Sequence, residues 1–172
     1  MPREAAYVLV DRIDVQAPAD RRRGRGALSN AVGRFEPEAR VSFDDGWELE
    51  EDLAPLRTTV RADAARTIIT RNDSPDISFD RSINPYRGCE HGCIYCYARP
   101  SHRYLGHSAG PDFETQLYAK PNAAALLEKE LGAPGYAPAT MALGTNTDPY
   151  QPIEREHQIT RSVLGVLERT GH

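Results

Sequence analysis

Long apolar runs, an export signal and an excess of positive charge are all missing from this sequence. No stretch of its 172 residues approaches 18 consecutive apolar residues, so no transmembrane helix is expected. Met1–Glu4 is not followed by the apolar core and cleavage site of a secretory signal. The formal net charge is −4, which argues against a globally basic nucleic-acid binder. We therefore expect a globular chain in the cytoplasm with no membrane partner.

Cysteine is also scarce, and its placement is informative. The chain has three cysteines, Cys89, Cys93 and Cys96, spaced as CxxxCxxC. An odd, clustered set argues against a disulfide framework and indicates a metal or cluster site in a reducing compartment. Three thiolates can hold three irons of a cubane cluster, and no fourth cysteine is present to bind the last iron. One metal position would stay open, as in catalytic sites.

Zinc is the alternative occupant of this cysteine cluster. A Cys₃His site would use the three thiolates with one of three histidines, His91, His102 or His107. The protein would then be a zinc-binding module for nucleic acid that uses the basic segment Arg21–Arg25. The segment Arg21–Arg25 has two other interpretations: it could be a solvated tail, or it could contact another part of the same fold.

The chain divides into two unequal parts, residues 1–63 and residues 64–172. Residues 1–63 show no sustained periodicity and are expected to form an extension made largely of loops or extended chain. Later apolar patterns predict strands over 66–70, 77–80, 113–119 and 140–143, and helices over 123–131 and 154–169. Alternating strands and helices are typical of parallel βα units, which places residues 64–172 in the α/β class. Three such units are too few to close a barrel, so we expect the opening part of a longer protein.

The sequence around the cysteines resembles a known superfamily. Residues 84–100 read NPYRGCEHGCIYCYARP, and CxxxCxxC with an aromatic residue before the last cysteine resembles the radical S-adenosylmethionine (SAM) superfamily. Within it, the chain is similar to uncharacterised relatives of spore photoproduct lyase, often labelled DNA repair photolyase-like. That group has segments like RNDSPDISFDRSINPY and ALGTNTDPYQPIEREHQITRSVL, which occupy residues 71–86 and 142–164 here.

This resemblance implies a fold, two cofactors and a reaction. The fold would be a partial TIM-type radical SAM barrel. Cys89, Cys93 and Cys96 would hold a 4Fe–4S cluster whose fourth iron is chelated by SAM. An electron from an external donor of the flavodoxin or ferredoxin type would split SAM into methionine and a 5′-deoxyadenosyl radical, which abstracts hydrogen from a substrate. The family label suggests a nucleic-acid lesion as that substrate, a suggestion to which the net charge adds no support.

Four residues are expected to contact SAM. In parallel βα folds ligands bind where strands end, and the polar residues Asn146, Thr147 and Asp148 follow the strand predicted over 140–143. The Asp148 carboxylate suits the amino group of SAM, although Asp148-Pro149 also reads as a simple turn. The resemblance adds Tyr95 beside the adenine. Lys120-Pro121-Asn122 stands where many members of the superfamily have Gly-Gly-Glu, so the remaining contacts of the amino group are open.

A third hypothesis concerns the length of the chain. If the remainder of the barrel is required for turnover, this chain would be a catalytically silent, truncated iron–sulfur protein.

Overall fold

A computed structural model describes residues 25–27, 29 and 56–172 of the protein. The described strands form two three-stranded sheets, with the orders β1-β5-β4 and β2-β3-β6. The strands are β1 (Thr59–Ala62), β2 (Ile69–Arg71), β3 (Arg81–Ile83), β4 (Tyr86–Arg87), β5 (Gln116–Ala119) and β6 (Met141–Leu143). The helices are the 3₁₀ helix η1 (Arg99–Leu105), α1 (Pro111–Thr115), α2 (Ala123–Leu131), α3 (Glu154–His157) and α4 (Ile159–Thr170).

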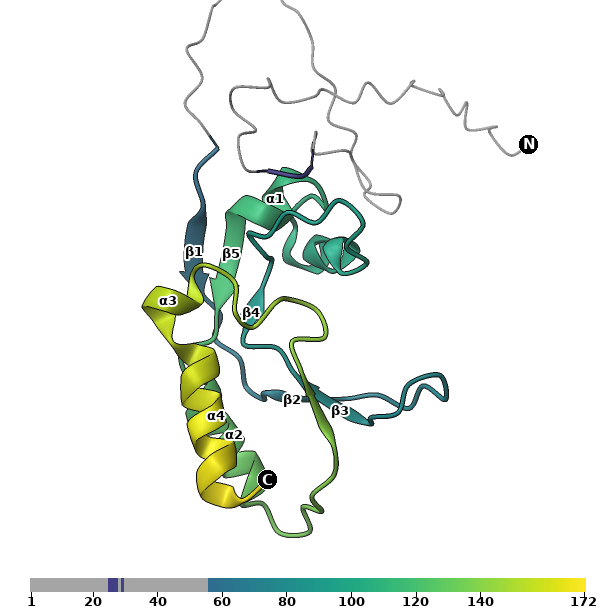
Figure 1. Cartoon of the computed structure of the whole chain (residues 1–172), viewed down its shortest axis with the longest axis vertical. Coiled ribbons are helices and arrows are strands. Elements are labelled where there is room, and N and C mark those ends of the chain that lie inside the picture. Colours follow the sequence, from purple (N-terminus) through teal and green to yellow (C-terminus); the bar gives the residue numbers. More distant parts are fainter. Residues whose placement is uncertain (1–24, 28, 30–55) are drawn as a thin grey trace, which may run out of the picture.

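Each sheet combines a parallel with an antiparallel pair. β1 pairs parallel with β5, and β3 pairs parallel with β6. β2 pairs antiparallel with β3, and β4 pairs antiparallel with β5. Asn84 and Pro85 separate β3 from β4, so residues 81–87 leave one sheet and enter the other before the cysteine loop begins (Figure 1). Pro85 has no N–H to give to a ladder, which accounts for the break between the two strands.

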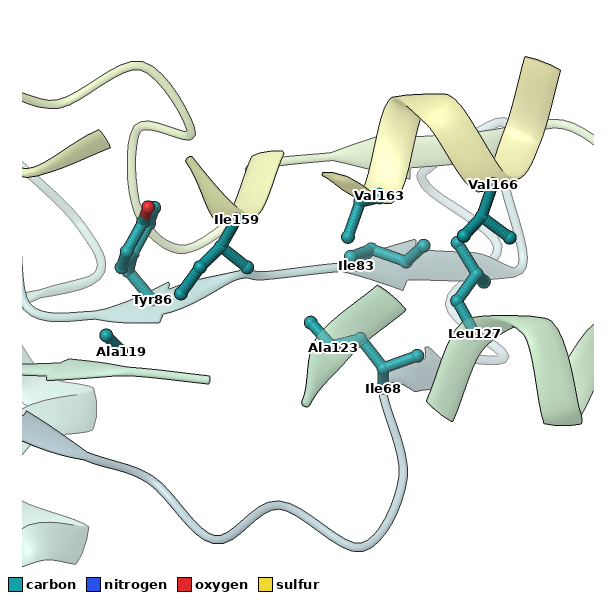
Figure 2. Packing of buried hydrophobic residues seen from close by; sticks show 9 residues of the cluster. All are labelled: Ile68, Ile83, Tyr86, Ala119, Ala123, Leu127, Ile159, Val163 and Val166. Carbon is teal, nitrogen blue, oxygen red and sulfur yellow. The ribbon is translucent and has the colours of Figure 1, made fainter. Parts of the chain in front are cut away.

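The main core lies between the second sheet and two helices, α2 and α4, that pack against each other (Figure 1). Figure 2 shows Ile83 of β3 between Val163 of α4 and Ala123 of α2. Ala123 and Leu127 are both buried one helical turn apart, the spacing that places an apolar stripe on one helix face. Burying a side chain such as Leu127 or Ile83 contributes about 1.5–3 kcal/mol. This core supports the strands from which the site loops leave.

The helix predicted over 154–169 is two helices. Gln158 has a φ of 48°, a left-handed conformation that ends α3. The Glu154 carboxylate then accepts hydrogen bonds from the backbone N–H groups of Thr160 and Arg161, both at 3.0 Å. These are first-turn donors of α4 that have no partner within the helix. The break lies at Gln158, and the side chain of Glu154 satisfies the donors at the new helix start.

Two of the strand predictions were wrong in their residue ranges. The strand expected over 77–80 is a loop, and the partner of β2 is β3 at Arg81–Ile83. The Asn72 side chain closes this loop by donating to the Phe79 carbonyl at 2.8 Å. The first half of the stretch 113–119 belongs to α1, because Pro111 begins a helical turn there. The helix predicted over 123–131 is confirmed as α2.

Only part of the predicted extension over 1–63 is described. Within it, β1 runs beside β5 in the first sheet. Most of the basic segment 21–25 lies outside the described residues, and Arg25 is its one described member. None of the helices in the described parts of the chain has the length and hydrophobicity needed to cross a bilayer.

Candidate functional site

The three cysteines lie on the loop that follows β4, and their thiols open into one cavity. Cys89 is buried, while Cys93 and Cys96 are partly exposed, and all three are free of disulfides. The cavity has a volume of about 350 Å³. Its opposite wall is the loop after β6, residues 144–149. The structure thus brings the cysteine loop and the polar loop together, although more than 40 residues separate them in the sequence. We call this space the cysteine cavity.

The cysteine cavity contains the donor types of both candidate metal sites, since the imidazole of His91 lines it together with the three thiols. In the described part of the chain, no group of three His, Cys, Asp or Glu side chains forms a site that could hold a metal ion as it stands. A structural zinc site needs four ligands gathered tetrahedrally around one point. Three thiols without a fourth cysteine are the donor set of a cubane cluster with one open iron, and the same thiols with His91 are the donor set of a Cys₃His zinc site.

Cys89 has the most distinctive environment of the three thiols. Burial raises the pKa of the Cys89 thiol, while the backbone N–H groups of His91 and Asp148 oppose that rise. The neighbouring Asp148 carboxylate and Cys96 add to it. A cysteine must lose its proton to bind a metal, so loading this site releases protons. N–H groups near a ligating sulfur are also one of the features that adjust the potential of an iron–sulfur cluster.

Asn84 holds the polar loop against the end of β3. Its Oδ1 accepts the Asn146 backbone N–H at 2.7 Å, and its Nδ2 donates to Thr145 Oγ1 at 3.1 Å. Thr147 is buried and donates its hydroxyl to the Tyr86 carbonyl at 3.0 Å. Gly144 starts the loop with a φ of 78°, and a Cβ there would lie 2.3 Å from Pro149 Cδ. The loop conformation therefore requires glycine at this position.

Asp148 connects the polar loop to the cysteine loop at the edge of the cavity. Its Oδ2 lies 3.2 Å from His91 Nε2, and its Oδ1 accepts the Tyr150 backbone N–H at 2.7 Å. The hydrogen bond from Tyr150 belongs to the Asp148-Pro149 turn, which the sequence also predicted as an alternative. The side chain of Asp148 remains 44% exposed and lines the cavity, so its carboxylate can still accept hydrogen bonds from a bound ligand.

Of the four residues expected at SAM, the structure brings three to the cysteine cavity and leaves one away from it. Asn146, Thr147 and Asp148 line the cavity. Tyr95 is 87% exposed and is not among the lining residues. Tyr97 lines the cavity instead and donates its hydroxyl to the Thr145 carbonyl.

Gln151 is a site residue that the sequence reasoning missed. It is fully buried beneath the cysteine loop. Its Nε2 donates to the Gly88 carbonyl at 3.2 Å, and its Oε1 accepts the Glu90 N–H at 3.2 Å. These two bonds hold the backbone on both sides of Cys89. In the sequence, the one feature that could have indicated a role for Gln151 is its place at the end of the polar segment that follows β6.

Glu114 is a second missed residue, and it joins three segments around the cysteine loop. It has no solvent exposure. Its Oε1 accepts Arg99 Nη2 at 2.5 Å and the Ala27 N–H at 2.9 Å, and its Oε2 accepts the Gly26 N–H at 3.0 Å. Arg99 Nε also donates to the Cys93 carbonyl at 3.0 Å. The buried pair therefore links Cys93 to residues 25–27, which we call the N-terminal strap.

Arg25 ties the N-terminal strap to the first sheet. Its guanidinium donates to the Glu114 carbonyl at 2.9 Å and to Thr58 Oγ1 at 2.8 Å. A Cβ on Gly26 would lie 1.7 Å from the Gly92 carbonyl oxygen, so the strap runs in direct contact with the cysteine loop. Of the three interpretations of the basic segment, Arg25 follows the one in which it contacts another part of the same fold.

Comparison with known proteins finds similarity without a functional description. The chain is 46% identical over 95 residues to an uncharacterised protein of Mycobacterium tuberculosis, and equally to one of Mycobacterium bovis. The match covers 55% of this chain and 28% of each relative. An uncharacterised protein of Methanocaldococcus jannaschii is 25% identical over 87 residues, covering 51% of this chain and 30% of the relative.

The chain thus spans under a third of the length of the curated relatives that it matches. No family model matches the chain, and no solved structure matches it. These comparisons relate the chain to bacterial and archaeal proteins that carry no functional description.

Proposed function

We propose that the protein is a radical SAM enzyme, or part of one, in which the cysteine cavity holds a 4Fe–4S cluster and SAM. The observation that carries the proposal is the shared cavity: all three cysteines of the chain and the polar loop 144–149 line it together. The resemblance of residues 71–100 and 142–164 to that superfamily supports the same assignment. When bound, the reduced cluster would supply the electron that cleaves SAM to a 5′-deoxyadenosyl radical for hydrogen abstraction.

The residues of this chain then have distinct roles. Cys89, Cys93 and Cys96 bind three irons and leave the fourth for SAM. Asp148 accepts hydrogen bonds from the positively charged amino group of SAM, an interaction stronger than one between neutral groups. Asn146 and Thr147 form the polar wall beside it.

Gln151 and Arg99 are positioning residues, because they hold the loop backbone next to Cys89 and Cys93. The electron donor would be an external protein of the flavodoxin or ferredoxin type, and the cytoplasm is the compartment that suits such a site.

Iron and sulfide analysis after anaerobic reconstitution tests the first half of the proposal. The expected result is about four irons and four sulfides per chain. The matched variant Cys93→Ala should lose the cluster, since two thiolates on this loop cannot hold it. One zinc per chain without sulfide would contradict the proposal and favour the zinc-binding module.

Binding of SAM tests the second half. SAM should change the paramagnetic spectrum of the reduced cluster, and reduction in its presence should release 5′-deoxyadenosine. Loss of one charged hydrogen bond costs roughly 1.5–3 kcal/mol, so Asp148→Ala should weaken SAM binding about 10- to 150-fold with unchanged iron content. Equal affinity in the two proteins would exclude this role for Asp148. A full cluster that binds SAM without producing deoxyadenosine would identify the chain as catalytically silent.

A further inference from the structure

A second cavity adjoins the cysteine cavity and includes residues to which the proposed cofactor site gives no role. Its volume is about 240 Å³, and Asn146 and Thr147 line both cavities. Its other walls include Lys120, His102 and Arg87. We call it the Lys120 cavity. Because the two cavities share two lining residues, a molecule bound in one would lie beside a molecule bound in the other.

The charges around the Lys120 cavity favour an anion. Lys120 is 8% exposed, and its ammonium donates to the Asn84 carbonyl at 2.7 Å. An ammonium has three N–H donors, and this is the one hydrogen bond that it makes within the described chain. Arg87 also lines the cavity and pairs with Asp63 through Nε at 2.6 Å. No aspartate or glutamate is among the described lining residues, and Asp63, which does not line the cavity, compensates the charge of Arg87. Burial and the neighbouring Arg87 lower the pKa of Lys120, and an anion in the cavity would offset both effects.

His102 adds an unsatisfied polar atom to the same walls. Its side chain is 1% exposed, and its Nε2 is buried with no hydrogen-bond partner among the described residues. Burial lowers the pKa of His102 to about 4, so the imidazole is neutral at neutral pH. Nearly all buried polar atoms in proteins have a partner, ordered water included, so His102 Nε2 has a hydrogen-bonding capacity that the described residues leave unused.

We propose that the Lys120 cavity binds a small oxyanion, either a phosphate or a carboxylate group, against the Lys120 ammonium. The site requires only residues of this chain and goes beyond the proposed function. Where that function holds, the cavity places an acidic group of a reaction partner next to the cofactors. Lys120 directly follows β5, and its backbone N–H donates to the Pro85 carbonyl at 3.1 Å, which fixes it beside the segment between β3 and β4.

The chain contains two lysines, and this makes the experiment direct. Protein labelled with ¹³C-lysine and prepared without iron should show two ε-carbon signals, which Lys120→Met and Lys129→Met variants assign. Lys129 is an exposed residue of α2 and serves as the internal control. Inorganic phosphate or acetate should shift the Lys120 signal saturably and leave the Lys129 signal in place. Comparing the two anions decides between phosphate and carboxylate.

Calorimetry with the preferred anion provides the second measurement. Lys120→Met should weaken binding about 10-fold or more, while Lys129→Met should bind as the parent does. A Lys120 signal that responds to neither anion would overturn the proposal, as would equal shifts of both signals. Since Lys129→Met alone assigns both signals, the titration of the parent protein remains decisive even if Lys120→Met does not fold. Because the protein is free of iron, failure here leaves the test of the cluster untouched.

Discussion

Removing the charge of Glu114 should destabilise the whole region around the cysteine loop. In Glu114→Gln, one carboxylate oxygen becomes an NH₂ group, which cannot accept the N–H groups that Glu114 now receives from Gly26, Ala27 and Arg99. The Arg99 side chain is only 10% exposed, so its charge would stay buried without its partner. Breaking a buried ion pair in this way costs about 3–5 kcal/mol.

Urea denaturation followed by circular dichroism measures this cost. With a slope of about 1–3 kcal/mol per molar urea, a loss of about 3 kcal/mol lowers the midpoint by about 1–3 M. The matched control is Glu128→Gln, which removes a carboxylate 3.6 Å from Arg169 on the surface, where both side chains are 62% exposed. That change should stay within about 0.5 kcal/mol of the parent.

Hydrogen exchange locates the effect of the substitution. Gly26 and Ala27 donate to different oxygens of Glu114, and Gln keeps only one of them, so one of these two amides should exchange faster in Glu114→Gln than in the parent. If Glu114→Gln and Glu128→Gln had the same midpoint, and the two amides kept their protection, the reasoning that Glu114 links the N-terminal strap to the cysteine loop would be refuted.

Three further predictions concern single residues. Gly144→Ala should destabilise the protein by more than Gly171→Ala in thermal melts, because both glycines have a positive φ but only Gly144 has atoms within 4 Å of a new Cβ; equal losses would contradict this. In the metal-free protein at neutral pH, iodoacetamide should alkylate Cys89 more slowly than Cys93, because burial raises the pKa of the Cys89 thiol and reduces its thiolate fraction. Mass spectrometry measures the two rates, and faster alkylation of Cys89 would contradict this reasoning. Stability should fall as the pH is lowered from 6.5 towards 4, because the unfolded chain takes up a proton on His102 that the folded protein does not; His102→Gln should remove this part of the dependence, and an unchanged pH profile would count against it.

The helices show how far periodicity can be trusted here. Leu126, Leu127 and Leu131 recur at helical spacing, and α2 covers the predicted residues 123–131. The same pattern over 154–169 did not reveal the break at Gln158, where the chain turns through a positive φ and the Glu154 side chain caps the start of α4. Capping by a side chain leaves hydrophobic periodicity unchanged, so the pattern contains no trace of it.

The cofactor residues divide in a similar way. The cysteine spacing and the polar loop after β6 were visible as local sequence features, and the structure places them on one cavity. Tyr95 and Tyr97 are equally aromatic and both follow Cys93, so the sequence could not decide which of them faces the cavity. The path of the loop backbone decides it, and Tyr97 is the lining residue.

By itself, the sequence determined the local features of this protein: three thiols on one short loop, a polar segment after residues 140–143, and the apolar faces of α2 and the later helix. Only the tertiary structure decided what surrounds the cysteine loop. Gly26 meets Glu114 across 88 positions, and Gln151 meets Gly88 across 63. Contacts of this separation depend on how the two sheets and α1 are arranged, and they leave no periodic signal in the chain. For this reason Glu114, Gln151 and the N-terminal strap became visible only once the chain was folded.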